Sequence, residues 1–465
     1  MSAVEPKSSE VLSPSWAVII LAAGQGTRML SDRAKVLHIL GGKPLLTHVI
    51  ESAQHLNPAQ ICVVYGHNGE KVRAALSSLP VIWVEQNPQL GTGHAVATAL
   101  PYLTHTENVL ILYGDVPLIQ PATLEVLLSA TLSGALALLT VELIDPTGYG
   151  RILRDNLSQV IGIIEEKDAT PEQRNIHEIN TGIMAVNKSA LVKWIAQLDN
   201  RNSQGEYYLT DIVHLAVKDK ITVKTIHPQS IIEVLGVNNR MQLAELERAY
   251  QARWTKKLME HGVTLRDPAR CDIRGELKHG RDVEIDLDVI LEGNIQLGNR
   301  VKIGPYCYLK DATIGDDVEI RAYSHLEDVK INANCIIGPF ARLRPGTELG
   351  NQVHIGNFVE IKQSTIAAET KINHLSYIGD AQVGRQVNIG AGTITCNYDG
   401  AHKHRTIIGD QAFIGSDTSL VAPVEIGAGA TIGAGSVITR NAPAGELTLA
   451  RTPQQTHFGW ERPVK

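Results

Sequence analysis

The sequence predicts an α/β protein made of a Rossmann-like domain, a connecting α-helix and a left-handed parallel β-helix. Three observations predict it. The chain has 465 residues, and a single hydrophobic core stops growing at roughly 250–300 residues, so at least two domains are expected. Short apolar runs alternate with helical patterns up to about residue 237. In the second half, aliphatic residues return every six positions.

The first half contains five short runs of apolar and β-branched residues that are typical of buried strands. They are "WAVIILA" (16–22), "QICVVYG" (60–66), "VIWVEQ" (81–86), "NVLILYGD" (108–115) and "LALLTVEL" (136–143). Helical patterns lie between them, at residues 44–56 and 93–103. Continuous apolar strands separated by helices favour a mostly parallel sheet that is covered on both faces.

Residues 238–262 interrupt this alternation with one helical pattern. Apolar residues recur there every three or four positions, at Leu243, Leu246, Tyr250, Trp254 and Leu258. This spacing is typical of an amphipathic helix, and Gly262 is a plausible stop. We therefore expect a flexible tail at 1–14, one domain at 15–237, a linker helix at 238–262, and a second domain at 263–465 that includes a C-terminal tail.

The second domain repeats with a period of six. The aliphatic positions are Ile331, Ile337, Leu343, Leu349, Ile355 and Ile361, and again Ile408, Ile414, Leu420, Ile426, Ile432 and Ile438. Six residues are too few for a pair of helices but suit one flat face of a parallel β-helix. Three hexads, or 18 residues, then close one coil, with the aliphatic residues pointing inward. The period breaks at "CNYDGAHKHRT" (396–406), where we expect a loop to leave the prism.

Composition narrows the class of protein. The formal net charge is −6, and lysine and arginine are scattered, so no basic surface points to nucleic acid. No stretch approaches the 18 apolar residues of a membrane span, and the polar N-terminus lacks the apolar region of a signal peptide. Five cysteines lie far apart without a CxxC pair, which favours reduced thiols. We expect a soluble, cytoplasmic protein.

A glycine-rich loop, "LAAGQGTRM" (21–29), follows the first strand directly. A dinucleotide-binding GxGxxG would need glycine where Met29 stands, and a Walker A motif would need GK[ST]. Backbone N–H groups in such a strand-to-helix turn can hold a phosphate, and Arg28 and Lys35 follow closely. The loop thus favours phosphate binding; the alternative is a tight turn that only requires glycine's conformational freedom.

Asp115 ends the apolar strand of "LYGDVPL" (112–118). Ligands of open α/β sheets bind at the carboxyl ends of the strands, and a carboxylate there is a good ligand for Mg²⁺. The alternative is a turn or helix-capping aspartate. "QLGTGHA" (89–95) is another glycine-rich turn, which is as compatible with an ordinary loop as with a site.

In the second half, two pairs of residues lie 18 positions apart. Arg344 and Lys362 should stack on neighbouring coils, where two cations repel unless an anion such as a sugar phosphate lies between them. The alternative is two solvated side chains that pair with Glu348 or Glu360. Ser416 and Ala434 have the same separation, which places them in one vertical groove.

Several motifs occur together and in order: "LAAGQGTRM" with Lys35, "QLGTGHA", "LYGDVPL", "PTGYGRI" (146–152), "EINTGI" (178–183), "GEYYLTD" (205–211) and "GVNNR" (236–240). Together they resemble the sugar-nucleotide pyrophosphorylases. With the hexapeptide repeats they closely resemble the bifunctional N-acetylglucosamine-1-phosphate uridylyltransferase / glucosamine-1-phosphate N-acetyltransferase family. The resemblance covers almost the whole chain beyond the N-terminal tail, and it implies that the first domain is a nucleotidyltransferase.

The resemblance implies the ligands of the first domain. UTP and the sugar nucleotide would contact Leu21, Ala22, Ala23, Gly24, Lys35, Gln86, Gly91, Thr92, Gly150, Glu165, Asn180 and Asn238. Asp115 and Asn238 would hold Mg²⁺, and Lys35 and Arg28 would support catalysis by neutralising phosphate charge. Glu165 and Asn180 are equally compatible with surface positions when considered alone, and Tyr207 and Tyr208 with packing under the sugar pocket.

The resemblance also implies the residues of the acetyltransfer site. An ammonium cannot attack a thioester, so a base is needed, and the resemblance singles out His374 among 17 histidines. Glu360 is a possible orienting residue, although spacing does not relate His374 to Lys362. Glucosamine-1-phosphate would contact Arg344, Lys362, Tyr377 and Asn388; acetyl-CoA, the co-substrate, would contact Ala391, Asn397, Tyr398, Ser416, Ala434 and Arg451. Cys396 is interpreted as an inert thiol.

The resulting hypothesis is a homotrimeric enzyme that acetylates glucosamine-1-phosphate and then transfers uridylyl from UTP. The resemblance implies acetyl sites shared between subunits, and Phe413 and "WERPVK" (460–465) are candidate contacts. One alternative is another sugar-1-phosphate nucleotidyltransferase whose β-helix only assembles or regulates it. Another is a non-enzymatic nucleotide-sugar sensor or assembly subunit.

Overall fold

The computed structural model describes residues 16–66, 69–104 and 106–463. The proposed N-terminal tail therefore lies outside the described residues. The chain divides into two compact units, Met1–Tyr250 and Gln251–Lys465. Among the described residues, no helix has both the length and the apolar composition needed to cross a membrane.

The first unit is built on a mixed sheet with the strand order β11-β7-β10-β6-β1-β4-β5. Its strands are β1 (Trp16–Ala22), β4 (Gln60–Tyr65), β5 (Ile82–Glu85), β6 (Asn108–Tyr113), β7 (Leu136–Glu142), β10 (Glu178–Asn187) and β11 (Val223–Ile226). A hairpin of β8 (Gly150–Arg154) and β9 (Val160–Ile164) joins it through β10. β1 is parallel to β4 and β6, but β10 is antiparallel to β6 and β7, so the sheet is less uniformly parallel than predicted.

Both faces of this sheet are buried, because consecutive residues of β1 belong to different cores. Val18 and Ile20 lie in one hydrophobic cluster and Ala17 and Ile19 in the other, all without exposed surface. The helices are α1 (Leu45–Gln54), α2 (Gly69–Ala75), α3 (Thr92–Ala99), α4 (Pro121–Thr131), α5 (Pro171–Arg174), α6 (Lys188–Ile195) and α7 (Ile212–Lys218). The first unit also contains short 3-10 helices and two short strands: η1 (Thr27–Met29), η2 (Lys35–Leu37), β2 (Ile39–Leu40), β3 (Lys43–Pro44), η3 (Leu100–Tyr102), η4 (Leu209–Asp211) and η5 (Ile231–Val234).

Helix α8 (Arg240–Glu260) occupies the segment for which the sequence predicts a helix. Of the five apolar positions in its pattern, Leu246, Tyr250 and Leu258 are buried. Leu243 and Trp254 are half-buried.

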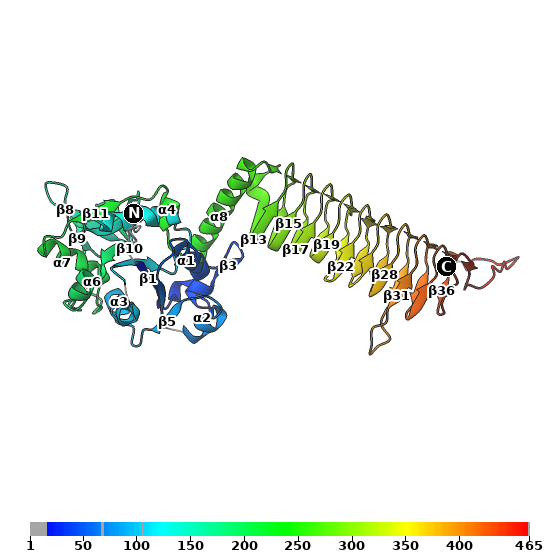
Figure 1. Ribbon diagram of the computed structural model, residues 1–465, viewed down its shortest axis with the longest axis horizontal. Coiled ribbons are helices and arrows are strands. Elements are labelled where there is room, and N and C mark those ends of the chain that lie inside the picture. The colour runs from blue at the N-terminus through cyan, green and yellow to red at the C-terminus, as the bar shows by residue number, and fades with distance from the viewer. Residues whose placement is uncertain (1–15, 67–68, 105, 464–465) are drawn as a thin grey trace, which may run out of the picture. The chain divides into compact units, whose positions relative to one another are not determined.

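The second unit is a stack of coils whose strands pair in parallel (Figure 1). One face is formed by β12 (Thr264–Leu265), β14 (Glu284–Ile285), β16 (Lys302–Ile303), β18 (Glu319–Ile320), β20 (Ile336–Ile337), β23 (His354–Asn357), β26 (Lys371–His374), β29 (Asn388–Ile389), β32 (Phe413–Ile414), β35 (Thr431–Ile432) and β37 (Leu447–Thr448). The long strands β13 (Cys271–His279), β15 (Val289–Leu297), β17 (Tyr308–Ile314) and β19 (His325–Ile331) start the second sheet. The turn η6 (Pro268–Arg270) precedes them.

Beyond β19 the second sheet continues along two separate strand paths. One contains β21 (Arg342–Leu343), β24 (Glu360–Lys362), β27 (Tyr377–Gly379), β30 (Ile394–Cys396), β33 (Ser419–Val421) and β36 (Val437–Ile438). The other contains β22 (Thr347–Leu349), β25 (Thr365–Ile366), β28 (Ala381–Val383), β31 (Thr406–Ile408) and β34 (Val424–Ile426). Three flat faces per coil are what the hexad period predicts, and the expected parallel β-helix of hexapeptide repeats is confirmed.

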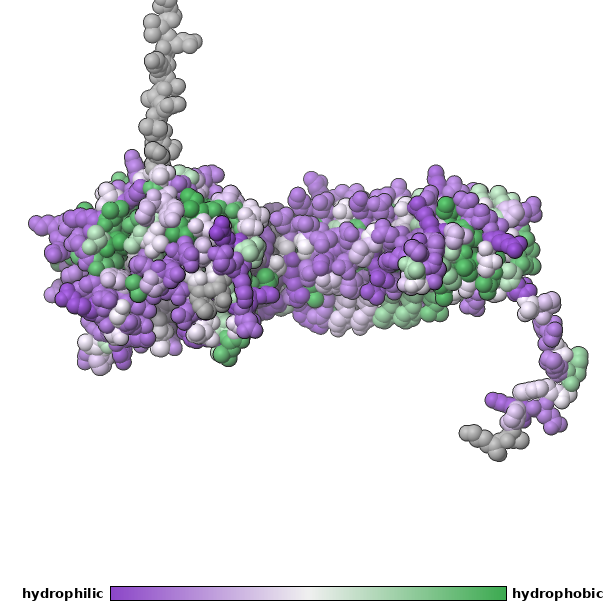
Figure 2. Space-filling view, turned by 90° about the horizontal axis from the view of Figure 1, so that it is seen from below, coloured by the Kyte–Doolittle hydropathy of each residue, from purple (hydrophilic) through white to green (hydrophobic). Residues whose placement is uncertain are grey.

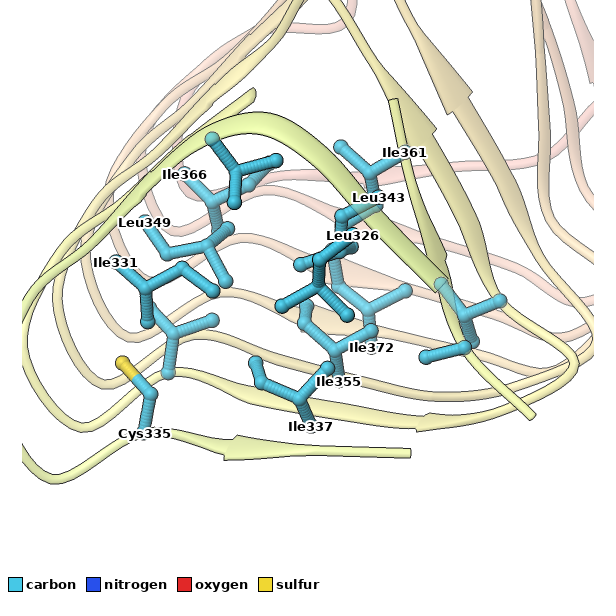
Figure 3. Close-up of a cluster of buried hydrophobic side chains, with 14 of the residues drawn as sticks. Leu326, Ile331, Cys335, Ile337, Leu343, Leu349, Ile355, Ile361, Ile366 and Ile372 are labelled. Carbon is cyan, nitrogen blue, oxygen red and sulfur yellow. The ribbon is translucent and has the colours of Figure 1, made fainter. Parts of the chain in front are cut away.

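The hexad residues form the core of this unit. Their side chains point into the prism from all three faces (Figure 3). Ile337 pairs with Ile355 in the next coil, and Leu343 pairs with Ile361, so identical positions stack along the axis. Each of these four residues is at most 1% exposed. The stacked inward-facing aliphatic side chains therefore form most of the hydrophobic core of this unit.

Not every coil has the 18 residues that three full hexads predict. Ile355 pairs with Ile372, a step of 17, because one corner between Ile361 and Ile366 is one residue shorter. Gln363 turns that corner in the left-handed region at φ 46°. The missing residue therefore shortens the corner, while the inward-facing aliphatic side chains of neighbouring coils stay paired.

One exposed corner carries a stack of aromatic side chains. The rings of Tyr306, Tyr323, Phe340 and Phe358 lie 4.9, 4.9 and 5.2 Å apart in sequence order, and each residue is 45–55% exposed. Figure 2 shows hydrophobic residues gathered along one edge of the coils, on a surface that is otherwise mainly hydrophilic.

Candidate active sites

The first unit contains a cavity of about 480 Å³ at the carboxyl ends of β1 and β6. Nine of the residues predicted to contact nucleotide or metal line it together: Leu21, Ala22, Ala23, Gly24, Lys35, Gln86, Gly91, Thr92 and Asp115. Six further residues line the cavity and were not predicted from the sequence: Gln25, Val36, Gln89, Ala95, Tyr113 and Glu206. The cavity lies at the sheet edge where α/β proteins bind their ligands.

The glycine-rich loop is held in its shape by neighbours that are distant in sequence. Gly26 adopts φ 65°, and a Cβ on it would lie 2.7 Å from Cβ of Lys35, so a side chain at this position would push Lys35 away. Gln89 donates a hydrogen bond from Nε2 to the carbonyl of Ala23 at 2.7 Å. Gly66 leaves room for it, because a Cβ there would lie 2.1 Å from Gln89 Nε2.

Four polar side chains converge at one end of the cavity. The Lys35 ammonium forms an ion pair with Asp115, and it also donates to Oδ1 of Asn238 at 3.3 Å. Arg28 donates to the same Asn238 oxygen at 3.0 Å. The structure thus brings together residues that lie between 80 and 210 positions apart in the chain.

These residues fit a magnesium ion. Mg²⁺ prefers oxygen ligands and is usually bound by one or two protein groups, with waters and phosphate oxygens completing its shell. Asp115 and Asn238 supply one carboxylate and one amide oxygen beside two cationic side chains. No cluster of three or more His, Cys, Asp or Glu side chains suited to a metal occurs among the described residues, so a metal held by protein alone is not indicated there.

Gln86 and the "QLGTGHA" turn form another part of the cavity lining. Gly91 precedes α3 at φ 105°, and a Cβ there would lie 2.7 Å from the carbonyl of Tyr207. Gly93 donates its N–H to that same carbonyl at 2.8 Å, and the Thr92 hydroxyl accepts from the N–H of Leu209 at 3.0 Å. The "GEYYLTD" segment therefore packs along the turn through its backbone.

Three residues predicted to contact the sugar lie near one another outside the lining of this cavity. Gly150 pairs with Asn180 across β8 and β10, and a Cβ on Gly150 would lie 3.4 Å from Oε2 of Glu165. Burial raises the pKa of the Glu165 carboxyl, although the Thr210 hydroxyl donates to its Oε1 at 2.9 Å and opposes that shift. Glu165 is half-buried rather than a free surface residue.

In the second unit, Arg344 and Lys362 occupy neighbouring coils as their spacing predicts, since Leu343 and Ile361 before them are paired. Arg344 donates to Glu360 at 2.8 Å, the partner named in the alternative interpretation. Lys362 lies close to Lys403 of the loop at 396–406, and its side-chain contact and positive charge lower the pKa of Lys403. Cationic side chains therefore gather here with only partial neutralisation among the described groups.

His374 ends β26 on the neighbouring face and is exposed. Its Nδ1 lies 2.9 Å from Oδ1 of Asn357, which is paired with it in the preceding coil. The expectation that Glu360 orients His374 is wrong, because the Glu360 carboxylate faces Arg344 and Arg342 instead. An amide oxygen only accepts, so Nδ1 carries the proton and Nε2 holds the lone pair.

Three of the residues predicted to bind acetyl-CoA occupy, in later coils, the same position that His374 has in its own. Ile372, Ile389, Ile414 and Ile432 are paired in successive coils, so the positions two residues later, His374, Ala391, Ser416 and Ala434, also follow one another. Arg451 Nη1 donates to the carbonyl of Ala434 at 2.8 Å.

The expected loop leaves the prism between β30 and β31. Tyr398 and Lys403 form a bridge there, and the Asn397 side chain, which is 8% exposed, donates to Asp380 and lies 3.4 Å from the Tyr377 hydroxyl. Tyr398 is 62% exposed. Asn388 starts β29 on the other face and is not brought to Tyr377 by strand pairing.

Comparison with known proteins finds a matching family for each of the two units. A family model described as a MobA-like NTP transferase domain matches residues 18–175, and bacterial transferase hexapeptide repeats match residues 311–344, 328–363 and 405–440. "Bifunctional protein GlmU" of Azoarcus sp. (strain BH72) is 56% identical over 448 residues, covering 96% of this chain and 99% of that protein. The chain belongs to the GlmU family.

Among solved structures, UDP-glucose pyrophosphorylase complexed with UDP-glucose is 18% identical with a TM-score of 0.43, covering 51% of this chain and 99% of that one. Membership of the GlmU family makes the chain a bifunctional uridylyltransferase and acetyltransferase of UDP-N-acetylglucosamine synthesis. The predicted family and activity class are confirmed. A non-enzymatic sensor and a β-helix that merely assembles the enzyme are excluded.

Proposed function

We propose that the first unit transfers uridylyl from UTP to N-acetylglucosamine-1-phosphate, and that the second unit first acetylates glucosamine-1-phosphate with acetyl-CoA. The single observation that carries the proposal is the convergence of Lys35, Arg28, Asp115 and Asn238 at one end of the glycine-rich cavity. Opposed charges and open backbone N–H groups at that point suit a triphosphate.

In the uridylyl step, an oxygen of the sugar phosphate attacks the α-phosphorus of UTP. A new P–O bond forms and the bond to the β-phosphate breaks, releasing pyrophosphate. No protein nucleophile is needed, because the barrier comes from bringing negative oxygens together in line. Lys35 and Arg28 neutralise phosphate charge, while the backbone from Leu21 to Gly24 positions the nucleotide. Gly150, Glu165 and Asn180 contact the sugar.

Asp115 and Asn238 would hold Mg²⁺ in this proposal, and the ion would supply positive charge for the phosphate oxygens. Lys35, which pairs with Asp115, would turn to the phosphates of the bound nucleotide. The same site binds UTP before the reaction and the UDP-sugar product after it.

In the acetyl step, Nε2 of His374 accepts the proton of the glucosamine ammonium, and the free amine attacks the thioester carbonyl. The C–N bond forms, and as the C–S bond breaks the nitrogen gives its second proton to the departing sulfur, so that coenzyme A leaves as the thiol. Arg344, Lys362, Tyr377 and Asn388 bind the sugar phosphate. Acetyl-CoA lies along Ala391, Asn397, Tyr398, Ser416, Ala434 and Arg451. The Nδ1 contact to Asn357 supports this role, because it leaves Nε2 free to act as the base.

We further propose a cytoplasmic homotrimer with acetyl sites shared between subunits. Phe413 is 49% exposed on one face, and the aromatic stack described above is about half exposed, so apolar side chains are available for a partner copy. Light scattering of the full chain tests this proposal: three chains per particle are expected, and a monomer with full acetyltransferase activity would overturn it.

The two half-reactions test the assignment of sites. Pyrophosphate release from UTP and N-acetylglucosamine-1-phosphate measures the first, and thiol release from acetyl-CoA and glucosamine-1-phosphate measures the second. Lys35→Met is expected to lose the first and keep the second. Loss of acetyl transfer alone would overturn the proposal.

A further inference from the structure

One histidine that the proposed reaction does not use contacts a residue proposed to bind nucleotide. His94 lies in the first turn of α3 and is half-buried. Its Nδ1 is 3.1 Å from Nε2 of Gln86. Gln86 lines the cavity and is 4% exposed, so its amide is almost entirely enclosed by protein.

The contacts of the Gln86 amide define which of its atoms faces the cavity. Nε2 has two protons; one is donated to the carbonyl of Gly91 at 2.9 Å and the other reaches His94. Because the amide nitrogen only donates, Nδ1 of His94 accepts and the imidazole carries its proton on Nε2. Oε1 of Gln86 accepts no hydrogen bond within the described part of the chain, which leaves it available to a ligand.

We propose that His94 is a positioning residue that selects the nucleotide base through Gln86. With both protons of Nε2 used, Gln86 presents an acceptor, Oε1, and no donor. A base with an N–H at its pairing edge, such as the N3–H of uracil, satisfies that acceptor. Cytosine has a lone pair at N3, which would face Oε1 and repel it. The inference rests on the proposed nucleotide site and adds a reason for its base preference.

Without His94, the second proton of Gln86 Nε2 has no acceptor, and rotation of the side-chain amide costs less. Only the hydrogen bond to the Gly91 carbonyl then keeps Nε2 from turning toward the base. Molecules in which the amide has turned must turn it back before UTP binds, so loss of a hydrogen bond of ordinary strength should weaken UTP binding by about tenfold. The loss falls on UTP binding and on the preference for UTP over CTP, and the reacting phosphates are not touched.

Two variants of His94 separate positioning from packing. His94→Leu keeps most of the volume and removes the acceptor. His94→Asn keeps an acceptor, because Oδ1 of asparagine lies close to where Nδ1 of histidine lies. His55→Leu is the control, since His55 is an exposed histidine at the C-cap of α1 whose Nδ1 contacts the backbone carbonyl of Glu51.

The experiment measures KM and kcat of the full-length enzyme with UTP and with CTP. We expect His94→Leu to raise the KM for UTP about tenfold, with kcat within about threefold, and to lower the UTP-to-CTP ratio of kcat/KM. His94→Asn should restore both values, and His55→Leu should match the wild type.

Equal behaviour of the Leu and Asn variants, or an unchanged UTP-to-CTP ratio, would overturn the inference. Gln86→Leu tests the nucleotide site on which it rests. If Gln86→Leu used UTP normally, the proposed nucleotide site would itself be wrong. If Gln86→Leu were impaired but His94→Leu had wild-type kinetics with UTP, only the role of His94 would be rejected. Circular dichroism of each variant checks that the first unit is folded.

Discussion

Replacing Asn357 by alanine tests how the base of the acetyl step is oriented. The amide oxygen of Asn357 lies 2.9 Å from Nδ1 of His374, and no other hydrogen bond of that imidazole occurs among the described residues. Asn357→Ala removes the acceptor that keeps the proton on Nδ1, so both tautomers and more ring orientations become accessible. Only molecules with a free Nε2 directed at the amine then react.

The size of the effect follows from the strength of that contact. A neutral hydrogen bond contributes about 0.5–1.5 kcal/mol net, and each 1.36 kcal/mol is tenfold in rate, so acetyl transfer should fall about 2- to 13-fold. Loss of the base itself in His374→Ala should reduce it about 10²- to 10⁴-fold.

The assay is release of the coenzyme A thiol at saturating substrates, with Asn357→Asp as the conservative variant that keeps an acceptor and should recover most of the rate. Pyrophosphate release by the first unit should be unchanged in all variants. Wild-type acetyl transfer by Asn357→Ala, or a loss as deep as that of His374→Ala, would refute the reasoning.

Three further predictions follow from the structure. Asp115→Asn should lower Mg²⁺-dependent pyrophosphate release about 100-fold or more, because the ion loses its carboxylate, and a Mn²⁺ titration of the variant should show weakened binding. Gly415→Val should destabilise the second unit by about 1–3 kcal/mol, since a Cβ there would lie 2.5 Å from the backbone nitrogen of Ala434; chemical denaturation measures it. In native protein at neutral pH, thiol reagents should reach Cys396 first, because burial raises the pKa of the other four thiols, that of Cys271 to about 12. The pKa values of these buried thiols in the folded protein are higher than the value near 9 in the unfolded chain. The buried thiols therefore contribute their full stability to the fold below pH 9, and this contribution is lost as pH rises from 9 towards the folded-state values.

The β-helix could be predicted in detail because its period is local. Every sixth residue faces inward whatever lies elsewhere in the chain, and pairs such as Ile414 with Ile432 follow from counting alone. The count fails where the loop at 396–406 lengthens a coil, so that Ile389 pairs with Ile414, and where a corner loses a residue, as between Ile361 and Ile366. That difference depends on how tightly a corner turns, which the aliphatic pattern does not encode.

The nucleotide cavity was predictable through its glycine-rich turns and Asp115, which follow buried strands directly. Gln89 and Glu206 were missed, since their positions depend on contacts between segments far apart in the chain. The partner of His374 was predicted wrongly for the same reason. A one-residue slip in spacing hides that Asn357, and not Glu360, stands beside it in the preceding coil.

We propose that one chain carries two independent active sites, and a pair of single-site variants tests this independence. Purified Asp115→Ala and His374→Ala are each assayed for both half-reactions, pyrophosphate release and thiol release. We expect Asp115→Ala to lose only the first and His374→Ala to lose only the second, so that mixing the two proteins restores the full sequence from glucosamine-1-phosphate to the UDP-sugar. Loss of both half-reactions in either folded variant would contradict it.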